Sequence, residues 1–68
     1  MKDKAMDLIK DYVSELYDDY GLTVCDGDGE LIVEAYDKRN IGSYVTFTVS
    51  DTGEINILEH LEDGVEVN

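Results

Sequence analysis

The stretch Tyr44-Val45-Thr46-Phe47-Thr48-Val49-Ser50 decides the fold, because its residues alternate between apolar side chains and side chains that carry a hydroxyl group. Successive side chains of a β-strand point to opposite faces of the sheet, so a period of two predicts a strand with one buried face. We expect the valines and the phenylalanine of this stretch in the core. We expect its threonines on the opposite face, toward solvent or a partner.

Similar short segments flank this strand and are separated by turns that contain glycine and aspartate. The predicted strands are residues 22–25, 30–37, 43–50 and 54–59. Short connections of this kind join neighbouring antiparallel strands, which indicates an antiparallel meander. Ile55 and Ile57 are expected to extend the buried face onto the last strand. The acidic residues 61–68 are predicted to form a frayed tail.

An amphipathic helix is predicted before the first strand, because apolar residues recur at a spacing of three and four over residues 3–20. Asp3 is suited to its N-terminus, and Gly21 to the left-handed residue that commonly follows a helix. The sequence therefore predicts a single α+β domain over residues 1–68. One N-terminal amphipathic helix would pack on a three- or four-stranded antiparallel meander.

The small size of the chain disfavours catalysis. A domain of 68 residues buries a thin core, which leaves no room for a deep pocket that excludes water. We therefore expect no enzyme activity and no catalytic residue. The single Cys25 forms no internal disulfide, and no apolar run suits an export signal or a membrane span. These features favour a cytoplasmic protein that does not act at membranes.

The residues that bind metals and phosphates in other proteins do not form a recognisable site. Asp26-Gly27-Asp28-Gly29-Glu30 matches the start of a calcium loop, but Leu31 stands where such a loop needs glycine. Cys25 and His60 lack the spacing of zinc ligands, and no glycine-rich phosphate loop is present. Five basic residues are too few for a surface that binds nucleic acid directly. We expect no metal and no cofactor.

The acidic residues carry the strongest functional signal. The chain has a net charge of -12, which exceeds the magnitude of about 2 to 8 that keeps a small domain soluble. One side of the predicted helix carries residues at a spacing of three or four, namely Asp7, Asp11, Ser14 or Glu15, and Asp18, and like-charge pairs at this spacing destabilise a helix. Asp18 and Asp19 are placed in its last turn, where the helix dipole disfavours anions. These arrangements favour a surface selected for binding a basic partner.

Nine acidic residues occur from position 11 to position 37 without an intervening lysine or arginine. They are the predicted contacts with the partner, together with one tyrosine that can anchor an interface or stack on a guanidinium group. The candidate residues are Asp11, Glu15, Asp18, Asp19, Asp26, Asp28, Glu30, Glu34, Asp37 and Tyr36. Carboxylates in such numbers can take the place of phosphates in the basic groove of a nucleic-acid-binding protein.

In these features the chain resembles the small acidic inhibitors of bacteriophages and mobile elements, the DNA-mimic anti-restriction and anti-CRISPR proteins. The resemblance rests on length, charge, a helix that ends at Asp18-Asp19-Tyr20, and a meander that bears Asp26, Asp28, Glu30, Glu34 and Asp37. It implies that the partner is a host defence nuclease or another nucleic-acid enzyme, whose binding groove the inhibitor occupies.

A second resemblance covers residues 6–59, where a helix and strands that include the stretch from Tyr44 to Ile55 are similar to a PepSY-type domain. It implies the same layout and an association with protease inhibition. That family is mostly extracytoplasmic, so the resemblance supports the layout more than the function.

A structural or oligomerising module is the alternative function. Ile32, Tyr36, Tyr44 and Leu58 are expected on the outer face of the sheet, and an apolar set of this kind can form an interface between copies of the chain. The sequence leaves open whether the protein is a monomer or a homodimer.

Overall fold

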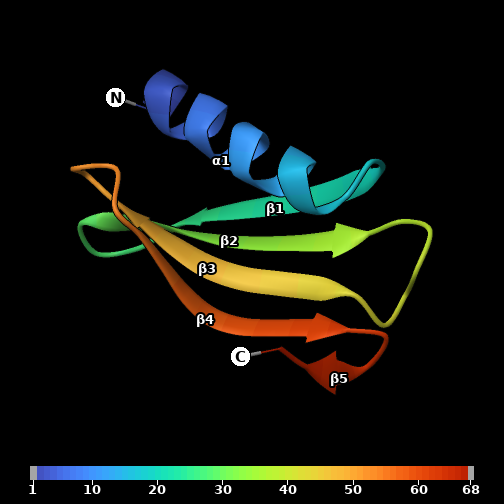
Figure 1. The fold of residues 1–68 in the computed structure, drawn as a ribbon. Coiled ribbons are helices and arrows are strands. Elements are labelled where there is room, and N and C mark those ends of the chain that lie inside the picture. Colours follow the sequence, from blue (N-terminus) through green and yellow to red (C-terminus); the bar gives the residue numbers. More distant parts are fainter. Residues whose placement is uncertain (1, 68) are drawn as a thin grey trace.

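The computed structural model describes residues 2–67, with side chains from Lys4 onward, and shows one helix followed by one sheet (Figure 1). The elements are α1 (Lys2–Leu16), β1 (Tyr20–Asp26), β2 (Glu30–Asp37), β3 (Tyr44–Ser50), β4 (Ile55–Glu62) and β5 (Val65–Glu66). The strands lie in sequence order and every neighbouring pair is antiparallel. The predicted α+β meander is confirmed, with five strands in place of three or four.

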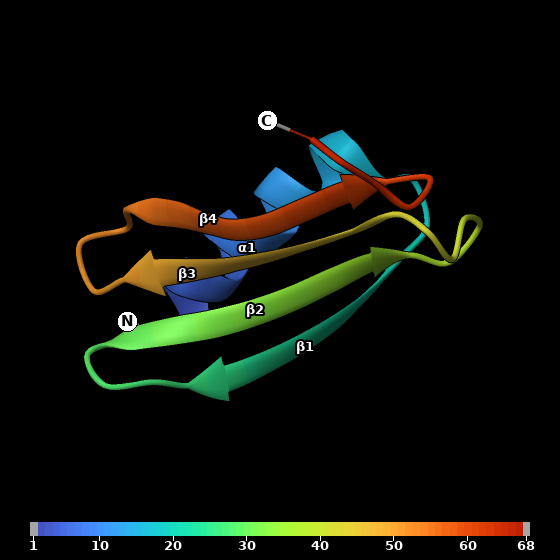
Figure 2. The same cartoon turned by 90° about the horizontal axis from the view of Figure 1, so that it is seen from below.

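The core lies between α1 and one face of the sheet, which we call the inner face. Ile9, Val13 and Tyr17 recur at a spacing of four and face the sheet from α1 and the residue after it. The sheet contributes Val33, Ala35, Val45, Phe47 and Val49. The opposite face, which we call the outer face, has no helix over it, as Figure 1 and Figure 2 show from two directions.

The helix is shorter than the apolar spacing predicts. It ends at Leu16, and the predicted last residues belong to a bend and to β1. Tyr20 and Gly21 pair with Asp37 and Tyr36 of β2, so strand pairing replaces the last predicted helical turn. Gly21 lies within a strand and does not adopt the left-handed conformation that the capping role requires.

Asp18 and Asp19 therefore follow the helix, and the prediction that they occupy its last turn is wrong. The acidic residue in the last turn is Glu15, and no basic residue accompanies it there. An anion at this place is unfavourable by about 0.3 to 1 kcal/mol. Glu15 is therefore the acidic residue that the dipole at this helix end destabilises.

Two predictions about exposure need correction. Ile57 pairs with Phe47 on the inner face as predicted, but it is 42 % exposed because the fully buried rows lie on β2 and β3. Thr48 lies on the outer face as predicted, but it is only 6 % exposed. It pairs with Ile32 on one side and Asn56 on the other, and these neighbours shield it from solvent.

The predicted frayed tail contains a hairpin. Asp63 and Gly64 have φ values of 54° and 79°, and such a pair forms the two-residue turn that joins antiparallel strands. The turn packs on the β2–β3 loop, because the Gly64 N–H donates to the Gly42 carbonyl at 2.8 Å. The Asp63 N–H donates to the Ser43 hydroxyl at 3.1 Å, and the Asn40 amide donates to the Asp63 carboxylate. Asn68 lies outside the described residues.

The Tyr17 hydroxyl is buried and has no hydrogen-bond partner among the described residues. Burial, together with the nearby carboxylates of Glu62 and Asp37, raises the pKa of Tyr17 to about 12. An unpaired buried hydroxyl destabilises the folded state by about 1 to 3 kcal/mol. This group is the main polar defect of the core.

Replacing Tyr17 with phenylalanine is expected to stabilise the protein by about 1 kcal/mol at neutral pH, because the unpaired hydroxyl is removed. The folded-state pKa lies above the value of about 10 for an unfolded chain, so this tyrosine's contribution to stability is lost as pH rises from about 10 to about 12. Denaturant titrations at several pH values should show a shallower alkaline loss of stability for Tyr17→Phe. Equal or lower stability at neutral pH would contradict the account, and the exposed Tyr36→Phe serves as control.

Candidate partner-binding surfaces

The ten predicted contact residues do not form one patch. Asp11 and Glu15 are exposed on α1. Asp18 and Asp19 lie in the link to β1, at the end of the sheet where Tyr20 pairs with Asp37. The Lys38 N–H donates to the Asp19 carbonyl at 2.9 Å, so a basic residue borders this group.

The remaining acids lie at the other end of the sheet and on its outer face. Asp26, Asp28 and Glu30 surround the β1–β2 turn, which the Gly27 N–H closes by donating to the Glu30 carbonyl at 2.7 Å. The seven residues of β1 separate the two ends by about 20 Å. Glu34 lies between the ends on the outer face of β2, and Tyr36 lies on the same face next to the Asp37 end.

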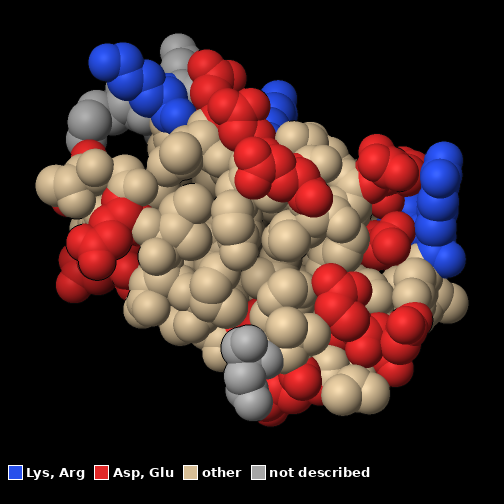
Figure 3. Space-filling view, in the orientation of Figure 1, with Lys and Arg blue, Asp and Glu red and all other residues tan. Residues whose placement is uncertain are grey.

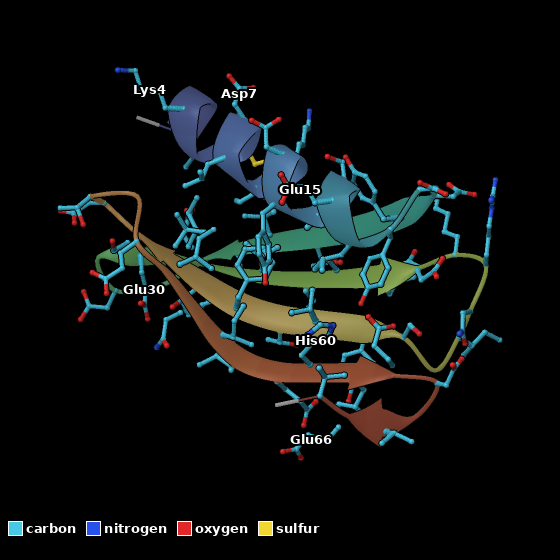
Figure 4. The ribbon with its side chains drawn as sticks, in the orientation of Figure 1. Lys4, Asp7, Glu15, Glu30, His60 and Glu66 are labelled. Carbon is cyan, nitrogen blue, oxygen red and sulfur yellow. The ribbon has the colours of Figure 1, made fainter. Side chains whose placement is uncertain are left out.

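Charge is distributed unevenly over the surface. Figure 3 shows carboxylates around the edge of a broad surface that carries no charge. In Figure 4, Asp7 points away from the sheet on the helix side, whereas Glu66 points away from α1 on the opposite side. Acids on α1 and acids on the outer face therefore cannot contact the same flat partner surface.

Most candidate carboxylates have no basic side chain paired with them among the residues whose side chains the structure describes. Apart from Asp26, none of them forms an ion pair with a lysine or arginine whose side chain the structure describes. Asp37 accepts the Arg39 backbone N–H at 2.9 Å, and the described ion pair joins His60 to Glu62. With Asp26 set aside, the exposed candidate acids are therefore accessible to an external basic group.

The outer face holds an open groove of about 650 Å³. Its main lining residues are Glu34 and Tyr36 on β2, Tyr44 and Thr46 on β3, and Glu59 on β4, with Lys38 at one end. Tyr36 pairs with Tyr44, and Thr46 pairs with Glu34 on one side and Glu59 on the other. Residues that pair in this way point to the same face of the sheet, so these five side chains form one cluster. We call this site the tyrosine groove.

The two tyrosines of the groove are held apart by different contacts. The Tyr36 ring lies over Gly21 of β1, where an added Cβ would come within 2.2 Å of its Cζ atom. The Tyr44 hydroxyl donates to the Glu59 carboxylate of β4 at 2.6 Å. One ring leans toward β1 and the other toward β4, and the groove lies between them.

A β-bulge brings Glu59 into the groove. The register between β3 and β4 shifts between Thr46 and Phe47, so that Phe47 pairs with Ile57 but Thr46 pairs with Glu59. Simple alternation from Ile57 would place Glu59 on the inner face. A bulge adds one residue to a strand and turns the following side chains to the other face. Sequence reasoning missed Glu59 because no sequence signal marks the bulge.

No protein-family model, curated protein or solved structure matches this chain. Among the described residues, no group of three or more histidine, cysteine and acidic side chains is placed to hold a metal ion. The described helix is neither long enough nor apolar enough to cross a membrane.

Replacing Glu59 with glutamine is expected to lower the pKa of Tyr44. The hydrogen bond to Glu59 is the main cause that raises the pKa of this tyrosine, followed by desolvation and the Glu59 charge. A hydrogen bond donated to a carboxylate favours the protonated phenol. Alkaline titration followed by phenolate absorbance or NMR should show Tyr44 ionising at lower pH in Glu59→Gln.

Glu54→Gln provides the matched control, because it removes one exposed carboxylate from the β3–β4 turn without touching Tyr44. An unchanged Tyr44 titration in Glu59→Gln, or an equal change in the control, would show that the hydrogen bond does not govern this tyrosine.

Proposed function

We propose that this protein binds a basic surface of a nucleic-acid-binding protein and blocks its groove by presenting carboxylates in place of phosphates. The proposal rests on the exposed candidate acids. Asp26 aside, none of them forms an ion pair with a lysine or arginine whose side chain the structure describes. An unneutralised surface of one sign attracts a basic partner and accelerates its encounter. It also repels nucleic acid and anionic membranes.

The outer face is the surface we assign to this contact. Besides Glu34 and Glu59 of the groove, it carries Glu30, which pairs with Ser50, and Glu66, which pairs with Leu61. Glu34 and Glu59 are two strands apart, which is about 10 Å, and Glu30 and Glu34 are about 13 Å apart along β2. Carboxylates at these separations can contact several basic side chains of one groove at once. Exposed Tyr36 adds an aromatic anchor near the Asp37 end of this face.

The partner class that we propose is a host defence nuclease or another nucleic-acid enzyme, in line with the resemblance to the DNA-mimic inhibitors. The protein acts by occupation alone and supplies no catalytic residue and no cofactor. Its affinity for the partner depends on charge, so it weakens as salt is raised. The contact takes place in the cytoplasm, where such enzymes meet their substrates.

Capture of partners from a cell extract on the immobilised protein tests this function. Nucleic-acid-binding proteins are expected among those retained at low salt and released at high salt, because salt screens charge pairs at a surface. Duplex DNA or RNA added to a purified captured protein should compete with binding of this chain. A captured protein that is saturated with nucleic acid and still binds this chain undiminished would contradict mimicry.

An oligomerising module is the second candidate, because Tyr36 and Leu58 of the expected outer-face set are 48 % and 57 % exposed. Sedimentation at low and high salt separates the two functions. The mimic is expected as a monomer at micromolar concentration, since a charge of -12 on each copy opposes association. An oligomer that persists unchanged when salt is varied would favour the module.

A further inference from the structure

We propose that the tyrosine groove receives an arginine side chain from an extended basic segment of the partner. The inference rests on the proposed function, and it adds the chemistry of the group that is recognised and the place where it binds. Tyr36 and Tyr44 form the two walls, and the neighbouring row of the sheet holds Thr46 with Glu34 on one side and Glu59 on the other.

The walls are positioned before any ligand arrives. Paired residues on neighbouring strands have Cβ atoms about 4.5 to 5.5 Å apart, so two tyrosines at such a pair would ordinarily pack on each other. Here Tyr36 leans over Gly21, and Tyr44 is tied to Glu59 by a 2.6 Å hydrogen bond. Because each ring is held on the side away from the other, the space between them stays open without a ligand. Binding then needs little reorganisation.

The groove chemistry suits a guanidinium group better than an ammonium group. A guanidinium is planar, stacks on aromatic rings and donates two parallel hydrogen bonds to one carboxylate. The groove offers two aromatic rings and two carboxylates on three adjacent strands. Only one oxygen of Glu59 is engaged by Tyr44, so its carboxylate retains capacity to accept. An ammonium group has no plane to stack.

The groove is larger than one side chain, and its charges indicate how a segment lies in it. Its volume of about 650 Å³ accommodates an arginine with part of the chain that carries it. Lys38 lies at the end near Asp37, whereas Glu34 and Glu59 lie farther along. A guanidinium is repelled from the Lys38 end and attracted to the carboxylates. Glu30 and Glu66 on the same face can contact further basic residues of the segment.

A second copy of the chain is a poorer occupant of this groove. Each copy carries a charge of -12, and Arg39 is the chain's single arginine. Burying the groove of one copy against the acidic outer face of another would place carboxylates against carboxylates. A basic partner removes that repulsion, and charge complementarity therefore selects it over self-association.

Titration with matched peptides tests the proposal. The probes are two capped peptides of glycine and serine with either three arginines or three lysines, so that charge and length are equal. In amide and aromatic NMR spectra, the arginine peptide is expected to bind about fivefold tighter than the lysine peptide. The largest shifts should fall on Glu34, Tyr36, Tyr44 and Thr46. Equal affinities, or shifts that are largest on α1, would overturn the proposal.

Two variants locate the interaction. Removing both groove carboxylates with Glu34→Gln and Glu59→Gln is expected to weaken binding of the arginine peptide about tenfold and to reduce the preference for arginine. Asp7→Asn with Glu54→Gln removes the same charge from surfaces outside the groove and is the control. An equal loss in both double variants would show that only net charge matters, which would overturn the groove assignment.

Gly21→Ala tests the wall itself without altering charge. Alanine is tolerated at this strand position because its backbone is not left-handed, but the new Cβ must displace the Tyr36 ring toward the groove. Binding of the arginine peptide is expected to fall about fivefold while the amide spectrum remains that of the fold. Should the alanine variant misfold, Tyr36→Leu removes the ring directly and gives the same expected loss. Undiminished binding by a folded variant would exclude Tyr36 as a wall.

Failure of this inference and failure of the proposed function give different results. If the groove does not select arginine but nucleic acid still displaces this chain from a captured protein, mimicry stands and uses other carboxylates. If the groove binds arginine and nucleic acid does not compete for the captured protein, the groove stands and mimicry is wrong.

Discussion

One helix can cover only one face of a sheet, and the division of this sheet into a buried face and an uncovered face follows from that constraint. The contact of α1 with β2 and β3 buries Ile9, Val13 and Phe47 and defines the inner face. The edge-to-face contact between Tyr12 and Phe47, with ring centroids 5.1 Å apart, fixes the helix further on this face. The outer face is left without a covering layer. Exposed side chains of this face, such as Glu34 and Tyr36, are therefore accessible to a partner.

The alternation of the β3 stretch sorts side chains to the two faces, and most of this sorting could be predicted from the sequence. Val45, Phe47 and Val49 are buried as expected, and the order of the strands follows from their short turns. The helix end could not be predicted from spacing alone, because Tyr17 continues the apolar pattern while Tyr20 already pairs with β2. Local spacing carries no information on whether these residues continue the helix or pair with a neighbouring strand.

The proposed binding surface could be predicted only in part from the sequence, for reasons that particular residues make clear. The acids were identified as a set, but the structure divides them between α1, the two ends of the sheet and the outer face. Glu59 was missed because a bulge decides its face. Asp63-Gly64 was the sequence signal for the last hairpin, because this dipeptide favours the left-handed conformations of a two-residue turn. The acidic residues around it suggested a frayed tail instead.

Charge and shape together point to the outer face as the surface that meets a partner, and mapping of a bound complex tests this claim most directly. Hydrogen exchange or NMR of this chain should be compared with and without a purified nucleic-acid-binding protein captured on it. The account predicts protection and shifts on β2, β3 and β4, centred on Glu34, Tyr36 and Tyr44, with α1 unchanged at Asp7 and Asp11. Perturbation confined to α1 would contradict it.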